Sequence, residues 1–152
     1  MESESLDFIG LEIPRDYMKK KEGNIMAVNF NQDSVFNLKP ISTDAVRNEV
    51  QGFLINGEEI CYAFQTVRDQ LIFTNKRIIS IDVQGITGKK KSFSTMPYSK
   101  IQFFSIQTPG FAELFPDSEL TLTFSSGFTA EFEFKGKVDI GAIGRLISEY
   151  VL

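Results

Sequence analysis

The side chains that most often carry out catalysis or bind metals are scarce in this sequence. Its 152 residues include no histidine and one cysteine, Cys61. Without histidine the commonest general base is absent, and neither a Ser-His-Asp nor a Cys-His arrangement can form. One cysteine excludes an intrachain disulfide and a cysteine-based metal site within one chain. We therefore expect a protein that is not an enzyme and has no cofactor, no metal and no catalytic residue.

Two pairs of carboxylates are close enough in sequence to be considered as sites. Glu58 and Glu59 are adjacent at the start of an expected strand, where successive side chains point to opposite faces, so they would not share a site. We interpret both as solvated turn charges. Asp117 and Glu119 flank a serine, but no spacing typical of a calcium loop surrounds them. Neither pair predicts a metal site.

The segment GITGKKK at residues 85–91 has the residue types of a phosphate-binding loop without its spacing. A nucleotide P-loop has four residues between its glycines and then opens a helix, whereas here two residues intervene and a strand is expected to follow. Two interpretations stay open. The segment is a hairpin connection whose glycines supply positive φ, or it contacts an anion or anionic lipid through Lys89, Lys90 and Lys91. Near a charged membrane each lysine contributes only about 1 kcal/mol.

Periodicity predicts one mainly β domain that positions these residues. Short runs rich in β-branched and aromatic residues predict strands over residues 58–65, 70–74, 76–83, 89–97 and 100–107. Strict alternation over residues 120–124 and 128–134, around a turn at 125–127, predicts a final hairpin with one apolar face. Fifteen Phe and no Trp indicate a core built largely from phenylalanine.

A helix is expected before and after these strands. Ser42 is a suitable N-cap for a short helix through Gln51, and Gly52 suits its end. Asp139 is a suitable N-cap for a C-terminal helix through Tyr150 that has one apolar face. An open barrel needs an apolar cover, and this second helix can provide it.

The first residues lack a sustained period. We predict an N-terminal extension over residues 1–40, which is mobile, and a folded domain over residues 41–152. The codons for Lys21, Glu22 and Gly23 can form a purine-rich run that resembles a ribosome-binding site two codons before Met26. Two interpretations are open: translation starts at Met26, or residues 1–25 form a real but mobile tail.

Charge and hydropathy exclude some partners. The net charge of −4 gives no global basic field for nucleic acid. No apolar run approaches the length of a membrane span, and the N-terminus lacks the basic and apolar regions of a signal peptide. We expect a cytoplasmic protein.

Three short motifs follow one another between residues 73 and 98: FTNKR at 73–77, GITGKK at 85–90 and MPY at 96–98. Their order and spacing resemble the bacterial pleckstrin-homology-like (PH-like) family of small proteins. The resemblance implies a seven-stranded, antiparallel, partly open barrel that is capped by a C-terminal α-helix and preceded by a short helix.

The resemblance also bears on function. Eukaryotic PH domains that bind phosphoinositides use a long basic loop between their first two strands. The corresponding loop here is residues 66–69, with one Arg beside one Asp, which argues against inositol-phosphate recognition. The bacterial family instead implies self-assembly into a closed cyclic ring, five-fold, with a polar surface where strands of adjacent protomers meet. Unpaired strand edges make such head-to-tail assembly physically natural.

We predict a non-enzymatic interaction module that forms such a homo-oligomeric ring and mediates protein–protein interaction with an unknown partner. The alternative is peripheral binding to anionic membrane lipid through Lys89, Lys90 and Lys91. A polar cluster is the predicted partner-binding surface, and within it we expect Asn75 to adopt the left-handed conformation that asparagine tolerates. The cluster consists of Arg68, Asp69, Asn75, Lys76 and Arg77. An apolar turn at residues 108–116 is expected to cap the core or to protrude.

Overall fold

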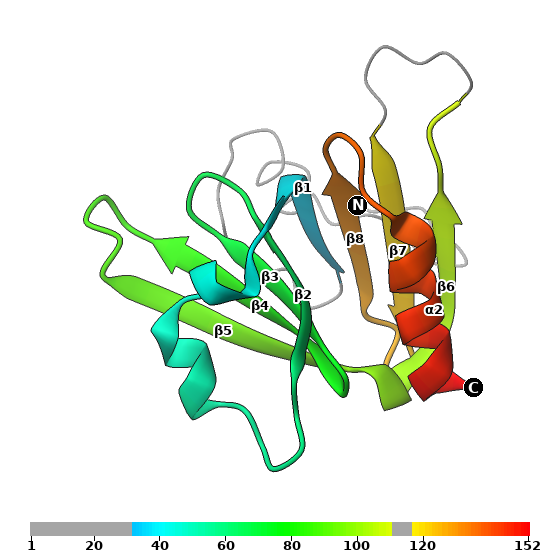
Figure 1. Ribbon diagram of the computed structural model, residues 1–152, viewed down its shortest axis with the longest axis horizontal. Coiled ribbons are helices and arrows are strands. Elements are labelled where there is room, and N and C mark those ends of the chain that lie inside the picture. Colours follow the sequence, from blue (N-terminus) through cyan, green and yellow to red (C-terminus); the bar gives the residue numbers. More distant parts are fainter. Residues whose placement is uncertain (1–31, 111–116) are drawn as a thin grey trace, which may run out of the picture.

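The computed structural model describes residues 32–110 and 117–152, which form an open eight-stranded sheet with one α-helix (Figure 1). The strands are β1 (Gln32–Ile41), β2 (Ile60–Gln65), β3 (Gln70–Thr74), β4 (Arg77–Gln84), β5 (Lys90–Pro97), β6 (Ile101–Gln107), β7 (Ser118–Phe124) and β8 (Thr129–Phe134). The helix α2 spans Ile140–Val151. The strand order is β5-β4-β3-β2-β1-β8-β7-β6, so β5 and β6 are the two edges.

The predicted mainly β fold with a C-terminal helix is confirmed. Each predicted strand is present, with ends that differ by at most two residues from the expected ones. The turn signals are the reason, since Asn75 and Lys76 separate β3 from β4 and Gly127 lies between β7 and β8. The expected apolar turn at residues 108–116 falls largely outside the described residues.

Strand β1 was not predicted. It pairs in parallel with β8 from Gln32 to Leu38 and then antiparallel with β2 from Lys39 to Ile41, so it joins the two halves of the sheet. Its register shifts between Val35 and Leu38, where Asn37 has a φ of 64°. This irregularity breaks the period-two alternation that identifies a strand in sequence. The sheet therefore starts inside the predicted N-terminal extension.

The short helix expected over residues 42–51 is wrong. Two 3-10 turns replace it, η1 (Thr43–Ala45) and η2 (Asn48–Gly52). Ser42 does cap the first turn, but the chain is extended between the turns. The buried side chain of Gln70 accepts from Arg47 N–H at 3.0 Å and donates to the Ala45 carbonyl at 3.1 Å. These backbone groups therefore bond to a distant side chain instead of to a helix.

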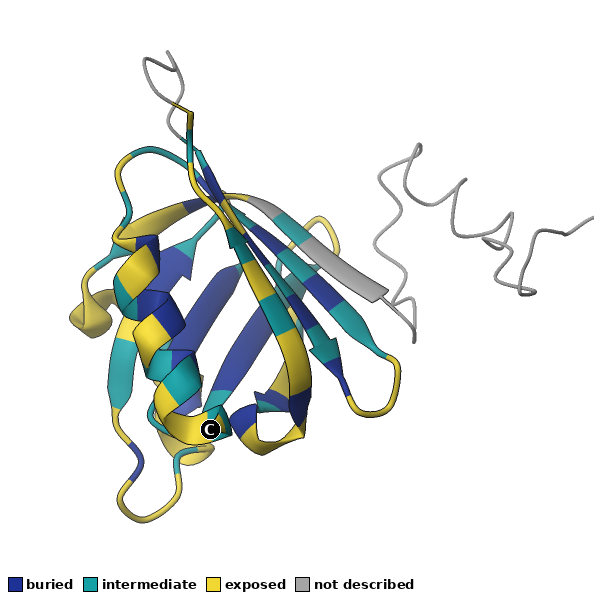
Figure 2. Ribbon diagram, turned by 90° about the vertical axis from the view of Figure 1, so that its right-hand side faces the viewer, coloured by how far each residue is buried: buried dark blue, intermediate teal, exposed yellow. Residues whose placement is uncertain are grey.

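Phenylalanine fills the main core, as its abundance predicted. This core lies between the two halves of the sheet and α2, where buried faces of the strands turn toward each other (Figure 2). Its aromatic members are Phe64, Phe73, Tyr98, Phe124, Phe132 and Phe134. A second apolar layer forms where η1 and η2 cover the outer face of β2, β3 and β4. Because β3 is covered on both faces, all five of its residues are buried.

Helix α2 packs closely against β6. Asp139 caps the helix, and its carboxylate accepts from Ala142 N–H at 3.0 Å. Gly144 is buried, and a Cβ added there would lie 2.6 Å from Cδ1 of Ile106. The missing side chain thus allows the helix to approach the strand. Within the described ranges, no helix is long and apolar enough to cross a membrane.

Replacing Gly144 with Leu is expected to lower the free energy of unfolding by about 2 kcal/mol or more, because the new side chain overpacks the contact with β6. Denaturant titration followed by circular dichroism measures the change. The control is Arg145→Leu on the exposed face of α2, for which we expect a change within about 0.5 kcal/mol. Equal effects of the two variants would show that the helix does not depend on this close approach.

Candidate functional site

The predicted polar cluster is divided between the two ends of β3. Arg68 and Asp69 lie in the turn that precedes this strand, whereas Asn75, Lys76 and Arg77 follow it. Five strand residues at about 3.4 Å each separate the groups by roughly 17 Å. The structure therefore does not bring the five residues into one surface, and each end of β3 forms a site of its own.

At the end after β3, Arg77 forms a bidentate ion pair with Glu58. The guanidinium Nε donates to Oε2 at 2.8 Å and Nη2 donates to Oε1 at 3.0 Å. The Glu58 side chain is fully buried and that of Arg77 is 18% exposed. The interpretation of Glu58 as a solvated turn charge is therefore wrong. The pair joins residues 19 positions apart, which no local sequence pattern reveals.

Further donors complete the site around Glu58. The Thr74 hydroxyl donates to Oε2 at 2.7 Å and the Ile55 N–H donates to Oε1 at 3.0 Å. Burial by itself raises the pKa of Glu58, but the hydrogen bonds from Arg77, Thr74 and Ile55, together with the charge of Arg77, outweigh burial and hold this pKa below its usual value. Glu58 is thus held as a carboxylate. We call Glu58, Thr74 and Arg77 the clamp.

Asn75 supports the same region by its side chain. Its Oδ1 accepts from Glu59 N–H at 2.9 Å and its Nδ2 donates to the Gly57 carbonyl at 3.0 Å. The expected left-handed conformation is wrong, because among the described non-glycine residues Asn37 alone has a positive φ. Asparagine is needed at this position for its two hydrogen bonds. Of the three polar residues after β3, Lys76 is the exposed one.

The clamp fastens three segments that are distant in sequence. Arg77 also donates to the Phe53 carbonyl, so the loop between η2 and β2 is held against the β3–β4 turn. The Tyr98 hydroxyl donates to the Thr74 carbonyl at 2.7 Å, and the Tyr98 ring stacks on Tyr150 of α2. Burial raises the pKa of Tyr98, which keeps the phenol protonated as a donor. These contacts stabilise the fold and leave little of Arg77 for a partner.

At the other end of β3, the β2–β3 turn and the β4–β5 loop are joined. Nη2 of Arg68 donates to the Gly85 carbonyl, and the Asp69 carboxylate accepts from Val83 N–H at 2.9 Å. Burial raises the pKa of Asp69, and the Val83 hydrogen bond opposes this rise. Nη2 of Arg47 donates to the Arg68 carbonyl at 2.8 Å. We call residues 66–69 and 85–91 together the basic tip.

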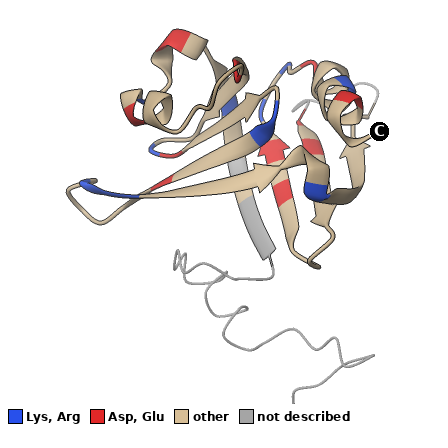
Figure 3. Cartoon of the chain, turned by 90° about the horizontal axis from the view of Figure 1, so that it is seen from below, with Lys and Arg blue, Asp and Glu red and all other residues tan. Residues whose placement is uncertain are grey.

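The lysine loop has the geometry of a hairpin connection. Gly85 and Gly88 have φ values of 78° and 67°, as predicted from the need for positive φ. Lys89 and Lys90 are exposed and Lys91 is half-buried. The lysines stand at the end of the long β4–β5 hairpin, at the left edge of Figure 3. Lys89 and Lys90 are therefore accessible for the predicted lipid contact, which stays a prediction.

A family model described as the bacterial PH domain matches residues 29–151 of the chain. The chain belongs to this family. The uncharacterized protein YjqA of Bacillus subtilis (strain 168) is 46% identical over 89 residues, which cover 59% of this chain and 70% of YjqA. The match to the family model begins at residue 29 and therefore includes all of β1, in agreement with the place of this strand in the sheet.

Two solved structures of similar proteins have the same fold. A DUF1696 family protein with a pleckstrin-homology domain from Shewanella loihica PV-4 aligns with a TM-score of 0.65 and 33% identity, covering 76% of this chain and 98% of that protein. A pleckstrin homology domain from Shewanella amazonensis SB2B aligns with a TM-score of 0.54 and 31% identity, covering 90% and 98%. The bacterial PH fold expected from the FTNKR, GITGKK and MPY motifs is confirmed.

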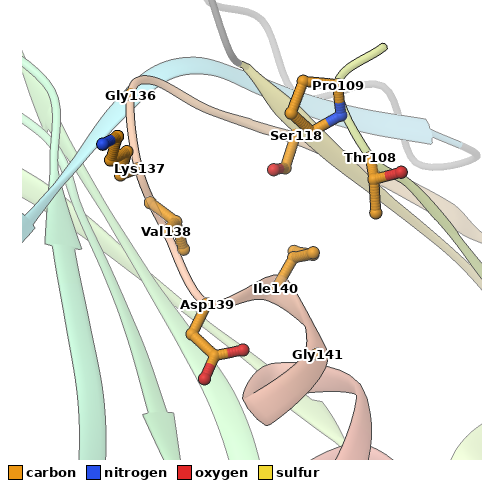
Figure 4. A pocket seen from close by; sticks show the side chains of 9 residues that line it. All are labelled: Thr108, Pro109, Ser118, Gly136, Lys137, Val138, Asp139, Ile140 and Gly141. Carbon is orange, nitrogen blue, oxygen red and sulfur yellow. The ribbon is translucent and has the colours of Figure 1, made fainter. Parts of the chain in front are cut away.

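A shallow pocket of about 290 Å³ lies at the N-terminus of α2 in this PH domain (Figure 4). Ser118, Lys137 and Asp139 are among its lining residues. Asp139 already caps the helix, so a carboxylate occupies the position where an anion would bind. Nearby Asp117 is paired with Lys135 at 2.7 Å. In residues 32–110 and 117–152 no group of three or more His, Cys, Asp or Glu is placed to hold a metal ion.

Breaking the clamp is expected to destabilise the fold strongly. Arg77→Met leaves the buried Glu58 carboxylate without its ion pair, and we expect the free energy of unfolding to fall by about 3 kcal/mol. Chemical denaturation measures this loss. The neighbouring exposed side chain provides the control, since Lys76→Ala should change stability by less than about 0.5 kcal/mol. Similar stabilities of the two variants would contradict the structural role of the pair.

The clamp also predicts a pH dependence. The pKa of Glu58 is lower in the folded state than the value of about 4.3 expected when unfolded, so its contribution to stability is present above that value and is lost as pH falls through the folded pKa. The stability difference between the wild type and Glu58→Gln should therefore be constant from about pH 7 to pH 5 and shrink below about pH 4. Denaturation at a series of pH values measures it. A difference that grows on acidification would show the opposite shift.

Proposed function

We propose that this bacterial PH domain is a non-enzymatic interaction module that assembles head to tail into a closed ring and binds another protein as that ring. One observation supports the assembly most directly, the open sheet. Among the described strands, β5 pairs with β4 alone and β6 pairs with β7 alone, so each has one row of unpaired backbone groups. Such edges are templates for pairing with another chain.

The two edges are different surfaces, so a contact between β5 of one copy and β6 of the next is heterologous. A heterologous contact repeats around an axis and closes into a ring when its rotation permits. The resemblance to single-domain members of the bacterial family favours five copies. A ring would repeat a weak binding site several times, and such repetition raises the overall affinity for a partner without a new contact.

On each edge the features that usually prevent pairing lie near an end of the strand, and in β6 this feature is the register shift between Ile101 and Phe103. Exposed positions along β6 are Gln102, Phe103, Ser105 and Gln107, and those near the middle of β5 are Ser94 and Thr95. Natural edges are often protected by an inward-pointing charge, a central proline or a bulge. In β5 the charges stand at the start of the strand and the proline at its end. The central part of each edge is therefore open to a second strand.

Two of the predicted partner-binding residues are exposed, Arg68 and Lys76, although Arg68 also donates to the Gly85 carbonyl. Asp69, Asn75 and Arg77 are half-buried and make the internal hydrogen bonds described above. Because the two exposed residues lie at opposite ends of β3, a partner would contact one of them in each copy or span the strand between them. Lys76 lies beside the clamp, which would hold its backbone rigid for such a contact.

Light scattering on the full chain tests the assembly. We expect one discrete mass that is a whole multiple of the 17.2 kDa chain, and five copies in the five-fold case. Ser105→Lys places a charge on the β6 edge and should yield monomer, because it blocks strand pairing. Thr121→Lys is the matched control, since Thr121 lies opposite Ser105 on the inner strand β7. A monomeric wild type, or equal effects of both variants, would contradict assembly through the edges.

A further inference from the structure

Two aromatic rings lie beside the unpaired edge of β5, the strand at one free margin of the sheet (Figure 1). Phe93 of β5 is half-buried and pairs with Ile81 of β4, and both belong to the outer apolar layer. The ring of Phe53, the residue after η2, contacts that of Phe93 with centroids 4.8 Å apart. Phe53 is 45% exposed. We call Phe53 and Phe93 the ledge.

The clamp holds the two parts of the ledge together. Nη2 of Arg77 donates to the Phe53 carbonyl, and Nη1 of Arg77 donates to the Thr95 hydroxyl on β5 at 3.3 Å. Arg77 thus joins the turn that carries Phe53 to the strand that carries Phe93. A surface whose parts are already held together loses less conformational freedom on binding. The ledge is therefore suited to receive a side chain from another chain.

The side chains of β5 on the ledge side follow a defined chemical order. Three successive outer-face positions are Lys91, Phe93 and Thr95, since their partners on β4 belong to the outer layer. Among the described residues, no carboxylate forms an ion pair with Lys91. A strand added to β5 would place every second side chain beside these positions. The edge therefore offers a cation, an aromatic ring and a hydroxyl at steps of two residues.

We propose that β5 captures an extended, acidic segment of another protein as an added strand. The unpaired backbone groups of β5 bind the backbone of the segment. An apolar side chain of the segment packs on the ledge, and a carboxylate two residues away pairs with Lys91. Only a polypeptide supplies both the backbone hydrogen bonds and side chains at this spacing, so the partner is a protein segment.

Capture also regulates the proposed assembly, and this part of the inference rests on the proposed function. The ring would place β6 of a neighbouring copy on β5, and one edge cannot pair with two strands at once. The captured segment therefore competes with β6, so a copy that holds it leaves the ring. Capture itself requires neither the ring nor the partner contact proposed at Arg68 or Lys76.

Fluorescence anisotropy with a synthetic peptide tests capture. The probe is the labelled peptide GTETFTETG, in which a glutamate lies two residues from the phenylalanine on each side, so that strand direction does not matter. The receptor is the Ser105→Lys variant, in which β6 is blocked and β5 is free. We expect saturable binding, about tenfold weaker for GTETSTETG and for GTKTFTKTG. GTETFPETG should not bind, because proline disrupts an added strand.

Matched substitutions in the same receptor locate the site. Phe53→Ser should weaken binding about fivefold, whereas Phe103→Ser, which removes an exposed phenylalanine from the other edge, should not. Lys91→Ala should also weaken binding about fivefold, and Lys100→Ala, which removes an exposed lysine outside β5, should not. Hydrogen exchange measured by NMR should show that the peptide protects amide groups of β5.

Several results would overturn capture. They are no binding of GTETFTETG, equal binding of all the peptides, equal losses with Phe53→Ser and Phe103→Ser, and protection only of amides outside β5.

Light scattering on the wild type reports the competition separately. Saturating peptide should lower the mass of the assembly to that of the single 17.2 kDa chain. An unchanged mass of an assembly that has bound the peptide would overturn the competition. A wild type that is monomeric without peptide would overturn both the ring and the competition, whereas anisotropy decides capture independently.

Discussion

The bidentate pair between Glu58 and Arg77 is the contact on which one whole end of the domain depends. A buried carboxylate is tolerated only when its oxygens are satisfied, and here four donors from three segments converge on it. Arg77 and Thr74 thereby fix the β3–β4 turn, the loop before β2 and, through Tyr98, the start of β6 relative to one another. Removing one partner affects all of these segments together.

Strand β1 sets the second constraint, since it joins two half-sheets that would otherwise be separate. It pairs with β8 along most of its length and with β2 at its end, and the irregularity at Asn37 allows the change of direction. Among the described strands, none connects the opposite margin of the sheet, because η3 (Tyr98–Lys100) links β5 to β6 without pairing them. The fold therefore closes on one side and leaves two free edges on the other.

These constraints give the two ends of β3 different characters. The clamp end buries the Glu58–Arg77 pair, while Glu59 and Lys76 are exposed there. At the basic tip, the side chains of Arg68 and Asp69 bond to backbone groups, so Lys89 and Lys90 stay exposed and two aliphatic side chains stand in solvent. The tip and the β5 edge share Lys90 and Lys91 at the start of that strand, whereas the β6 edge is a separate surface of this PH domain.

Local signals in the sequence determined strands β2 to β8, the turns, the C-terminal helix and the family motifs, because periodicity, turn residues and capping act over a few neighbouring positions. The Asp139 cap and the positive φ of Gly85 and Gly88 are of this kind. The strand predicted over residues 70–74 likewise separates Arg68 from Arg77. Local signals missed β1, whose alternation is broken at Asn37. The tertiary structure alone decided the burial of Glu58 and the breaking of the expected helix by Gln70. Each of these depends on groups that lie 16 to 25 positions apart along the chain, and folding alone brings such groups into contact.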